Sequence, residues 1–259
     1  MLQETFASGD SFMHRLDPRI RLLSAGAYSI VVALAHSFQT LSAAILIAFV
    51  LVMLAQLPAR DVMKRIMVVN GFTVLLWLIL PLTFPGPIVL TLGPLPLHQP
   101  GIMMAAQITL KSNAILLTLI ALVTTMNFST LGYALNWLHV PDKIVHLLLM
   151  TYRYVFVIDQ EYQRLIRAAR IRGFRPGTNM HTYKTYAYIV GMLLVRSVIR
   201  ADRVYKAMLC RGFKRKFYCL CYFKSGRIEW LYGTAMVGII TVLIYLEWFS
   251  KTSILVKVL

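Results

Sequence analysis

The chain has 259 residues, of which 58% are apolar and 14% charged, with a mean hydropathy of +0.67. Soluble domains carry about 45–50% apolar and about 25% charged residues, so this composition indicates a membrane protein and excludes a disordered chain. Three cysteines are too few to hold a chain of this length together as a disulfide scaffold. A formal net charge of +17 would suggest nucleic-acid binding in a soluble protein. In a membrane protein, the positions of the basic residues instead indicate which segments face the cytoplasm. We therefore predict a bilayer and no nucleic acid as partner.

Five apolar stretches have about the length that a helix needs to cross a bilayer, which is about 17–25 residues. The first two are nearly contiguous and predict a helical hairpin. A proline-rich segment between the third and the fourth predicts extended backbone rather than helix. The stretches are Leu22–Phe38, Leu41–Leu57, Ile66–Phe84, Met103–Met126 and Trp230–Phe249.

The basic residues are distributed unevenly along the chain. Of the 27 Lys and Arg residues, 18 lie between His139 and Glu229, where only five Asp and Glu residues accompany them. The connections that follow the first and third stretches carry no Lys or Arg. The positive-inside rule then places the N-terminus, the Pro58–Arg65 loop and His139–Glu229 in the cytoplasm and the C-terminus outside. Five spans satisfy this parity, which predicts a multi-pass protein of the cell (inner) membrane.

The basic segment is itself partly apolar. Its stretches Ile144–Ile158 and Thr185–Ile199 are interrupted by Arg153 and Arg196, and an arginine at the centre of a span is costly. We interpret these stretches as helices at the inner membrane surface or partly embedded in it, and the number of embedded helices stays open. The fold class is therefore an all-α polytopic membrane protein with about five transmembrane helices and two to three cytoplasmic helices.

Helix boundaries and domains follow from capping residues. Asp17-Pro18 predicts a helix start with Asp as N-cap and Pro at the first helical position. Pro141-Asp142 predicts another start, and Gly173 and Gly212 predict two helix ends. We expect three domains. They are residues 1–138, with four spans, residues 139–229, the basic cytoplasmic part, and residues 230–259, the last span and an outside tail.

An internal repeat lies in the basic segment, with its two copies offset by 39 residues. Positions i, i+4 and i+8 share one face of a helix. A small alanine on that face lets a partner approach closely, the planar arginine fork suits carboxylates, and the phenylalanine offers an apolar anchor. The pattern predicts two equivalent docking helix ends, with ordinary capping by glycine as the alternative. The copies are Arg164, Ala168, Arg172, Gly173 and Phe174, and Arg203, Ala207, Arg211, Gly212 and Phe213.

No residue pattern indicates an enzyme of its own. The chain lacks a P-loop and any pair of histidines at zinc-enzyme spacing, so we assign no catalytic residue, no metal ligand and no cofactor. Cys210, Cys219 and Cys221 have spacings that do not favour a metal, and a soft-metal site is the minority interpretation.

Two alternative functions would each require other residues. A membrane enzyme acting on anionic lipid phosphates would use the Asp159–Glu161 pair, which lacks a partner motif. A self-sufficient carrier or channel would use polar residues within the spans, and these are no more than helix packing requires. Lys111 either reaches toward the outer surface or makes an interhelical contact. The polar span residues are Asn70, Thr73, Lys111, Asn113 and Thr118.

The sequence resembles the transmembrane T component of energy-coupling factor transporters, of the CbiQ type found in cobalt uptake systems. The resemblance covers nearly the whole chain and is most specific between Pro141 and Phe213. It rests on His14–Arg19, Ala168–Gly177, His181–Tyr186 with Gly191–Ser197, and Arg203–Phe213.

The resemblance implies a non-enzymatic coupling subunit. In that family, two coupling helices end in Ala…Arg-Gly motifs that insert into two ABC-type ATPase subunits, and the T component transmits their ATP-driven closure to a separate substrate-binding S component. Carried over, the docking residues are Ala168, Arg172, Gly173, Ala207, Arg211 and Gly212, supported by Arg164, Phe174, Arg203 and Phe213. The resemblance further implies a CbiM-like S component and cobalt as substrate, with nickel or another substrate as the alternative, and leaves a small accessory membrane subunit open.

Overall fold

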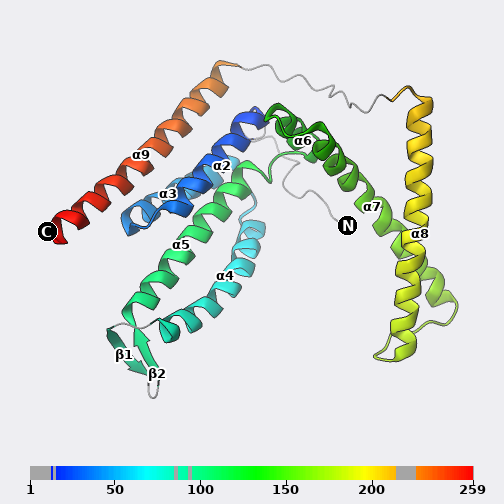
Figure 1. The fold of residues 1–259 in the computed structure, drawn as a ribbon, viewed down its shortest axis with the longest axis horizontal. Helices are drawn as coiled ribbons and strands as arrows, with labels where there is room; N and C mark the ends of the chain where they lie inside the picture. The colour runs from blue at the N-terminus through cyan, green and yellow to red at the C-terminus, as the bar shows by residue number, and fades with distance from the viewer. Residues whose placement is uncertain (1–12, 14–15, 85–86, 93–94, 214–225, 259) are drawn as a thin grey trace. The chain divides into compact units, whose positions relative to one another are not determined.

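The computed structural model describes residue 13 and residues 16–84, 87–92, 95–213 and 226–258 (Figure 1). The described chain is helical apart from one short β-hairpin, which confirms the expected all-α class. The elements are α2 Pro18–Leu34, α3 Phe38–Ala55, α4 Ala59–Thr83, β1 Ile88–Leu92, β2 Leu95–His98, α5 Gln99–Leu122, α6 Phe128–Trp137, α7 Asp142–Ile171, α8 Met180–Cys210 and α9 Arg227–Val258.

Contacts divide the chain into two compact units. One comprises Gln3–Ala134 and Phe223–Leu259 and contains α2 to α5, the β-hairpin, most of α6, and α9; we call it the bundle. The other comprises Leu135–Tyr222 and contains α7 and α8; we call it the basic hairpin, since it carries most of the Lys and Arg residues. The functional division of the sequence into residues 1–138, 139–229 and 230–259 stays a prediction.

Four of the described helices are long and apolar enough to cross a membrane, namely α3, α4, α5 and α9. The first predicted stretch corresponds to α2, which has 17 residues. Much of the surface of α4 and α9 is exposed in the chain alone, including large apolar side chains such as Phe72 and Val242. That exposure is expected of helices whose solvent is lipid.

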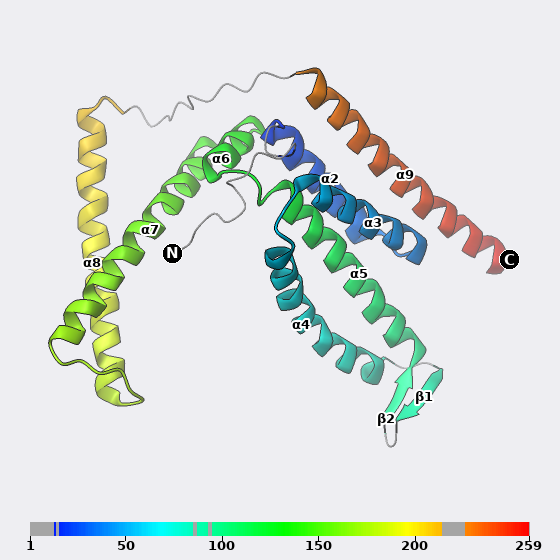
Figure 2. The ribbon, with the colours of Figure 1, turned by 180° about the vertical axis from the view of Figure 1, so that it is seen from behind.

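The bundle is organised around α5, which contacts α2, α3 and α4, as both views show (Figure 2). Alanines dominate these contacts: Ala44, Ala48, Ala114 and Ala121 are all fully buried. Small side chains let helix backbones approach closely, which is the main source of packing energy between helices in lipid. The Tyr28 hydroxyl adds a polar contact by donating to the Ala44 carbonyl at 2.6 Å.

The proline-rich segment contains the β-hairpin, in which Thr91 pairs with Pro96 and Leu92 with Leu95. Extended backbone was expected, but paired strands were not, because the segment lacks the alternating pattern that predicts them. Beyond the hairpin, α5 starts against the end of α4. A Cβ atom on Gly101 would lie 2.6 Å from the Pro81 Cα, so only glycine permits this approach.

A buried arginine connects the start of α2 to the end of α5 by hydrogen bonds. Asp17 caps α2 by accepting from the Arg19 backbone N–H at 2.9 Å, as expected. Arg21 follows and is 2% exposed; its Nη2 donates to the Leu122 carbonyl at 2.6 Å and to the Thr125 hydroxyl. Because the last carbonyls of a helix lack intrahelical partners, this guanidinium caps the C-terminus of α5.

Polar side chains hold the connection between α2 and α3. Lys111 Nζ donates to the Ala33 carbonyl at 2.9 Å, and Gln107 Nε2 donates to the His36 carbonyl at 2.8 Å. Glu247 of α9 accepts from the His36 backbone N–H at 2.8 Å. Of the two interpretations of Lys111, the structure therefore favours the interhelical contact.

Candidate docking site

The basic hairpin consists of two antiparallel helices of 30 and 31 residues, each about 45 Å long. Their direction follows from the contacts. Glu161 near the middle of α7 pairs with Arg196 near the middle of α8, and the His146 ring of α7 stacks on Phe213 just beyond α8. Both ribbon views show the two helices crossing (Figures 1 and 2). The two C-termini therefore lie at opposite ends of the hairpin.

The first repeat copy ends α7 in a Schellman cap. Gly173 has φ +84° and its N–H donates to the Arg170 carbonyl at 3.0 Å, while the Phe174 N–H donates to the Ala169 carbonyl at 3.1 Å. This pair of bonds defines the motif, and the left-handed residue in it is normally glycine because other residues are strained there. The predicted stop at Gly173 is confirmed.

The second copy ends α8 in the same way. Gly212 has φ +75° and donates to the Leu209 carbonyl at 3.0 Å, and the Phe213 N–H donates to the Met208 carbonyl at 3.1 Å. Two segments offset by 39 residues thus form caps with matching hydrogen bonds. The repeat in the sequence is a repeat in three dimensions.

The matched positions face outward. Residues at all three positions of the Ala…Arg-Gly motif are exposed in both copies, as are the arginines that begin each copy. They are Ala168, Arg172, Gly173, Ala207, Arg211, Gly212, Arg164 and Arg203. A glycine cap does not require an exposed alanine and arginine on the preceding turn. The exposed face is therefore available for contact with a partner.

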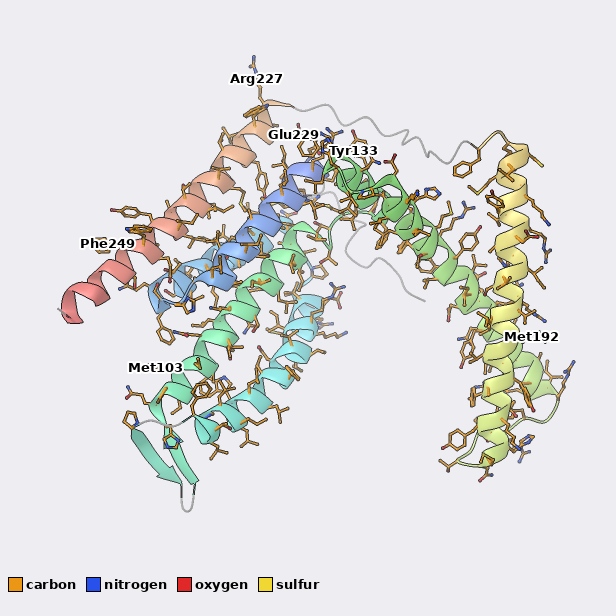
Figure 3. All side chains as sticks on the ribbon, viewed as in Figure 1. Met103, Tyr133, Met192, Arg227, Glu229 and Phe249 are labelled. Carbon is orange, nitrogen blue, oxygen red and sulfur yellow. The ribbon has the colours of Figure 1, made fainter. Side chains whose placement is uncertain are left out.

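A groove of about 580 Å³ runs beside the first motif. Ala168, Arg172 and Gly173 line one side of it, and α8 residues including His181 and Met192 line the other. Met192 is labelled in Figure 3 on the part of α8 that passes α7. The groove gives this helix end a concave flank with a basic rim.

The second motif has two neighbouring grooves. One of about 460 Å³ is lined by Arg203 and Ala207 together with Glu161, Arg196 and Arg200. The other, of about 550 Å³, is lined mainly by apolar side chains such as Leu147, Met150 and Met208, with Arg200 among the polar ones. The two helix ends are therefore alike in backbone but differ in what lies beside them.

Both repeat phenylalanines contact their own chain. Phe174 is half-buried and meets the Tyr186 ring edge-on at 5.7 Å between centroids. Phe213 is half-buried and stacks on His146 at 5.9 Å, and desolvation lowers the pKa of this histidine. These rings support the caps from inside, so a role as anchor for a partner stays a prediction.

One acidic side chain joins the two helices at their centre. Glu161 of α7 accepts from Arg196 of α8, lies 3.9 Å from Arg200 of α8 and 3.6 Å from Arg164 of its own helix. The Arg196 hydrogen bond, followed by the charges of the three arginines, lowers the pKa of Glu161. The sequence predicted for Glu161 only a possible use as an acid in an enzyme. Arg196 and Arg200 lie 35 and 39 residues further along the chain, and no sequence pattern links them to Glu161.

The other sequence candidates lie as follows. Asn113 Nδ2 donates to the Asn70 side chain at 3.0 Å across α4 and α5, whereas Thr73 and Thr118 bond within their own helices. Cys210 is a free, exposed thiol. Among the residues that the structure describes, no three His, Cys, Asp or Glu side chains group as a metal site requires. His14, Arg15, Cys219 and Cys221 lie outside these residues.

Comparison with known proteins identifies the family. The family described as cobalt transport protein, CbiQ, matches residues 9–218. The chain belongs to this family. It is 28% identical to the energy-coupling factor transporter transmembrane protein EcfT of Leuconostoc gelidum subsp. gasicomitatum, over 92% of this chain and 93% of the relative.

Two further relatives carry the same description. The Acidaminococcus fermentans protein is 27% identical over 93% of this chain and 94% of its own length. The Bacillus subtilis protein is 27% identical over 83% of this chain and 85% of its own length. The CbiQ-family chain is thus a membrane-embedded T component of an energy-coupling factor transporter, and it is a transport component rather than an enzyme.

Proposed function

We propose that this CbiQ-family chain couples two ABC-type ATPases to a separate substrate-binding membrane subunit. The observation that carries the proposal is the pair of Schellman-capped Arg-Gly ends at opposite ends of one antiparallel hairpin. Each end presents an exposed alanine and arginine, which suit a close-fitting socket with a carboxylate. Two such ends on one rigid hairpin match two sockets on a pair of ATPases.

The arrangement in the membrane follows the charges. The N-terminus and residues 139–229 face the cytoplasm, where the ATPases are, and the C-terminus lies outside. The exposed apolar surfaces of α4 and α9 then face lipid or the substrate-binding subunit. A small accessory membrane subunit is compatible with this arrangement.

Cobalt is the proposed substrate, and a CbiM-like protein is the proposed S component. Both rest on the resemblance and on the description of the family as cobalt transport protein. Nickel or another substrate is the alternative, since the T component needs no residue that recognises the substrate. The membrane-enzyme alternative is weakened because its candidate acid, Glu161, is engaged by three arginines.

The test is co-purification from the native host in mild detergent. Mass spectrometry should find an ABC-type ATPase with the tagged wild-type chain and at least tenfold less with Arg172→Glu/Arg211→Glu, because each reversed charge repels its carboxylate. The matched control is Arg153→Glu/Arg167→Glu, which changes two exposed arginines of the same hairpin outside the matched positions. It should retain the ATPase.

Two outcomes would overturn parts of the proposal. Equal ATPase recovery with wild type and with Arg172→Glu/Arg211→Glu removes the docking role of the two motifs. A co-purified membrane protein that binds a substrate other than cobalt removes the cobalt assignment and leaves the coupling role in place.

A further inference from the structure

The two helices of the basic hairpin are held together by little apolar packing. Of the residues on α7 and α8, only Val145, Ile166, Thr182 and Ile189 are buried. Grooves open between the helices on both sides of their centre, one beside Arg172 and one beside Met208. Apolar burial therefore constrains the crossing angle weakly, which leaves the polar contact at the centre and the ring contacts near the two ends to constrain it.

That central contact is the Glu161 cluster. The Glu161 side chain is 13% exposed, whereas the side chains of Arg164, Arg196 and Arg200 are 67%, 47% and 45% exposed. One partly buried carboxylate thus gathers three arginines from two helices around a single point. Without its charge, three guanidinium groups would be left close together, and the attraction between the helices would turn into repulsion.

The position of Glu161 in the repeat explains why it can do this. The 39-residue offset that relates the two docking motifs also relates position 161 to position 200. In an antiparallel pair of repeats, two equivalent positions can face each other at the centre, and identical charges there would repel. The chain has Glu161 in one copy and Arg200 in the other, and the two lie 3.9 Å apart.

The cluster also touches the surroundings of both docking ends. Arg196 lines the groove that contains Ala168 and Arg172. Glu161 and Arg200 line the groove that contains Ala207 and Arg203. A substitution of Glu161 is therefore expected to alter the surroundings of both docking ends.

We propose that Glu161 is a positioning residue that fixes the angle at which α7 and α8 cross, and with it the separation of the two docking ends. This inference rests on the proposed function, since a fixed separation matters only if both ends dock together. Two ends held at the right spacing bind a paired partner more tightly than two independent ends, because the second contact becomes intramolecular.

The test measures the angle directly, on the full chain in lipid nanodiscs. Spin labels are placed by Ile144→Cys and Met180→Cys, exposed positions near the N-terminal ends of α7 and α8 and outside the docking motifs, with all three native cysteines replaced by serine. Pulsed electron paramagnetic resonance should give one narrow distance distribution for the parent and for Glu161→Asp. Glu161→Gln should give a broad or shifted distribution.

Two variants make the test specific. Asp202→Asn removes the same charge from an acid that pairs with Lys206 of its own helix, 2.7 Å away, and should leave the distribution narrow. Glu161→Arg/Arg196→Glu reverses the interhelical pair and should restore a narrow distribution, which a merely space-filling role of Glu161 would not do. An unchanged distribution in Glu161→Gln, or equal broadening in Asp202→Asn, would overturn the inference.

ATPase recovery separates this inference from the proposed function. Glu161→Gln should lower the co-purified ATPase about fivefold, a typical effect of losing a small ion network, and the charge reversal should recover it. If Arg172→Glu/Arg211→Glu keeps the ATPase while Glu161→Gln broadens the distances, the docking role fails and the positioning role stands. If the docking variant loses the ATPase and Glu161→Gln changes neither readout, only the positioning role fails.

Discussion

The bundle and the basic hairpin are both helical, but they are stabilised in different ways. In the bundle, fully buried alanines bring α2, α3 and α5 together, and polar side chains such as Arg21 are buried against backbone carbonyls. In the hairpin, few side chains are buried, and the helices are held by caps at their ends and an ion cluster at their centre. The core of the bundle, formed by α2, α3 and α5, is therefore stabilised by internal packing, whereas the hairpin leaves most of its surface available to partners.

The largest expected effect is in the bundle. Arg21→Ala should lower the free energy of unfolding by about 3 kcal/mol, because it opens a cavity and leaves the Leu122 carbonyl and Thr125 hydroxyl without their buried donor. Arg167→Ala, at an exposed position of the hairpin, should change it by less than about 0.5 kcal/mol. Thermal unfolding of the purified chain in detergent measures both. Equal shifts would contradict the contrast between the two units.

A smaller effect in the same unit tests the close approach of α4 and α5. Gly101→Ala should cost about 2 kcal/mol, because the new methyl group would meet the backbone of Leu80 and Pro81 and push the helices apart. Gly71→Ala is the matched control within α4, where a Cβ atom meets nothing within 4 Å. It should be neutral or stabilising, since alanine is the better helix former. If both variants unfold at the same temperature, the helices are not as close as described.

The same contrast explains how much the sequence predicted. Helix boundaries at Asp17, Gly173 and Gly212 were predicted correctly, because capping is a local property of a few neighbouring residues. The five apolar stretches correspond to five helices, and four of these, α3, α4, α5 and α9, are long and apolar enough to span a bilayer. Length and hydrophobicity are local properties too.

What the sequence did not reveal depends on residues distant along the chain. Arg21 directly precedes the first apolar stretch and nothing in the neighbouring sequence indicates burial, but the structure buries it against residues about a hundred positions away. The Asp159–Glu161 pair was considered only for an enzyme and lacked a partner motif, because the partners of Glu161, Arg196 and Arg200, lie on another helix. The β-hairpin depends on pairing between two strands that carry no alternating pattern. The matched exposure of the two docking ends was anticipated only because the repeat itself is visible in the sequence.

The smallest expected effect is a pH dependence confined to the hairpin. Hydrogen bonding by Arg196 holds the pKa of Glu161 below its ordinary value of 4.5. A carboxyl group whose pKa is lowered on folding stabilises the fold at pH values above its unfolded pKa, and this contribution is lost as the pH falls through the folded pKa. The distance between labels at positions 144 and 180 should therefore stay constant from neutral pH down to about 4.5 and broaden only below it. Asp202→Asn should keep this transition, whereas Glu161→Gln should remove it, because its distribution is broad at every pH. A transition of the same size in Glu161→Gln would assign the loosening to another acid and separate the low-pH behaviour of the hairpin from its central cluster.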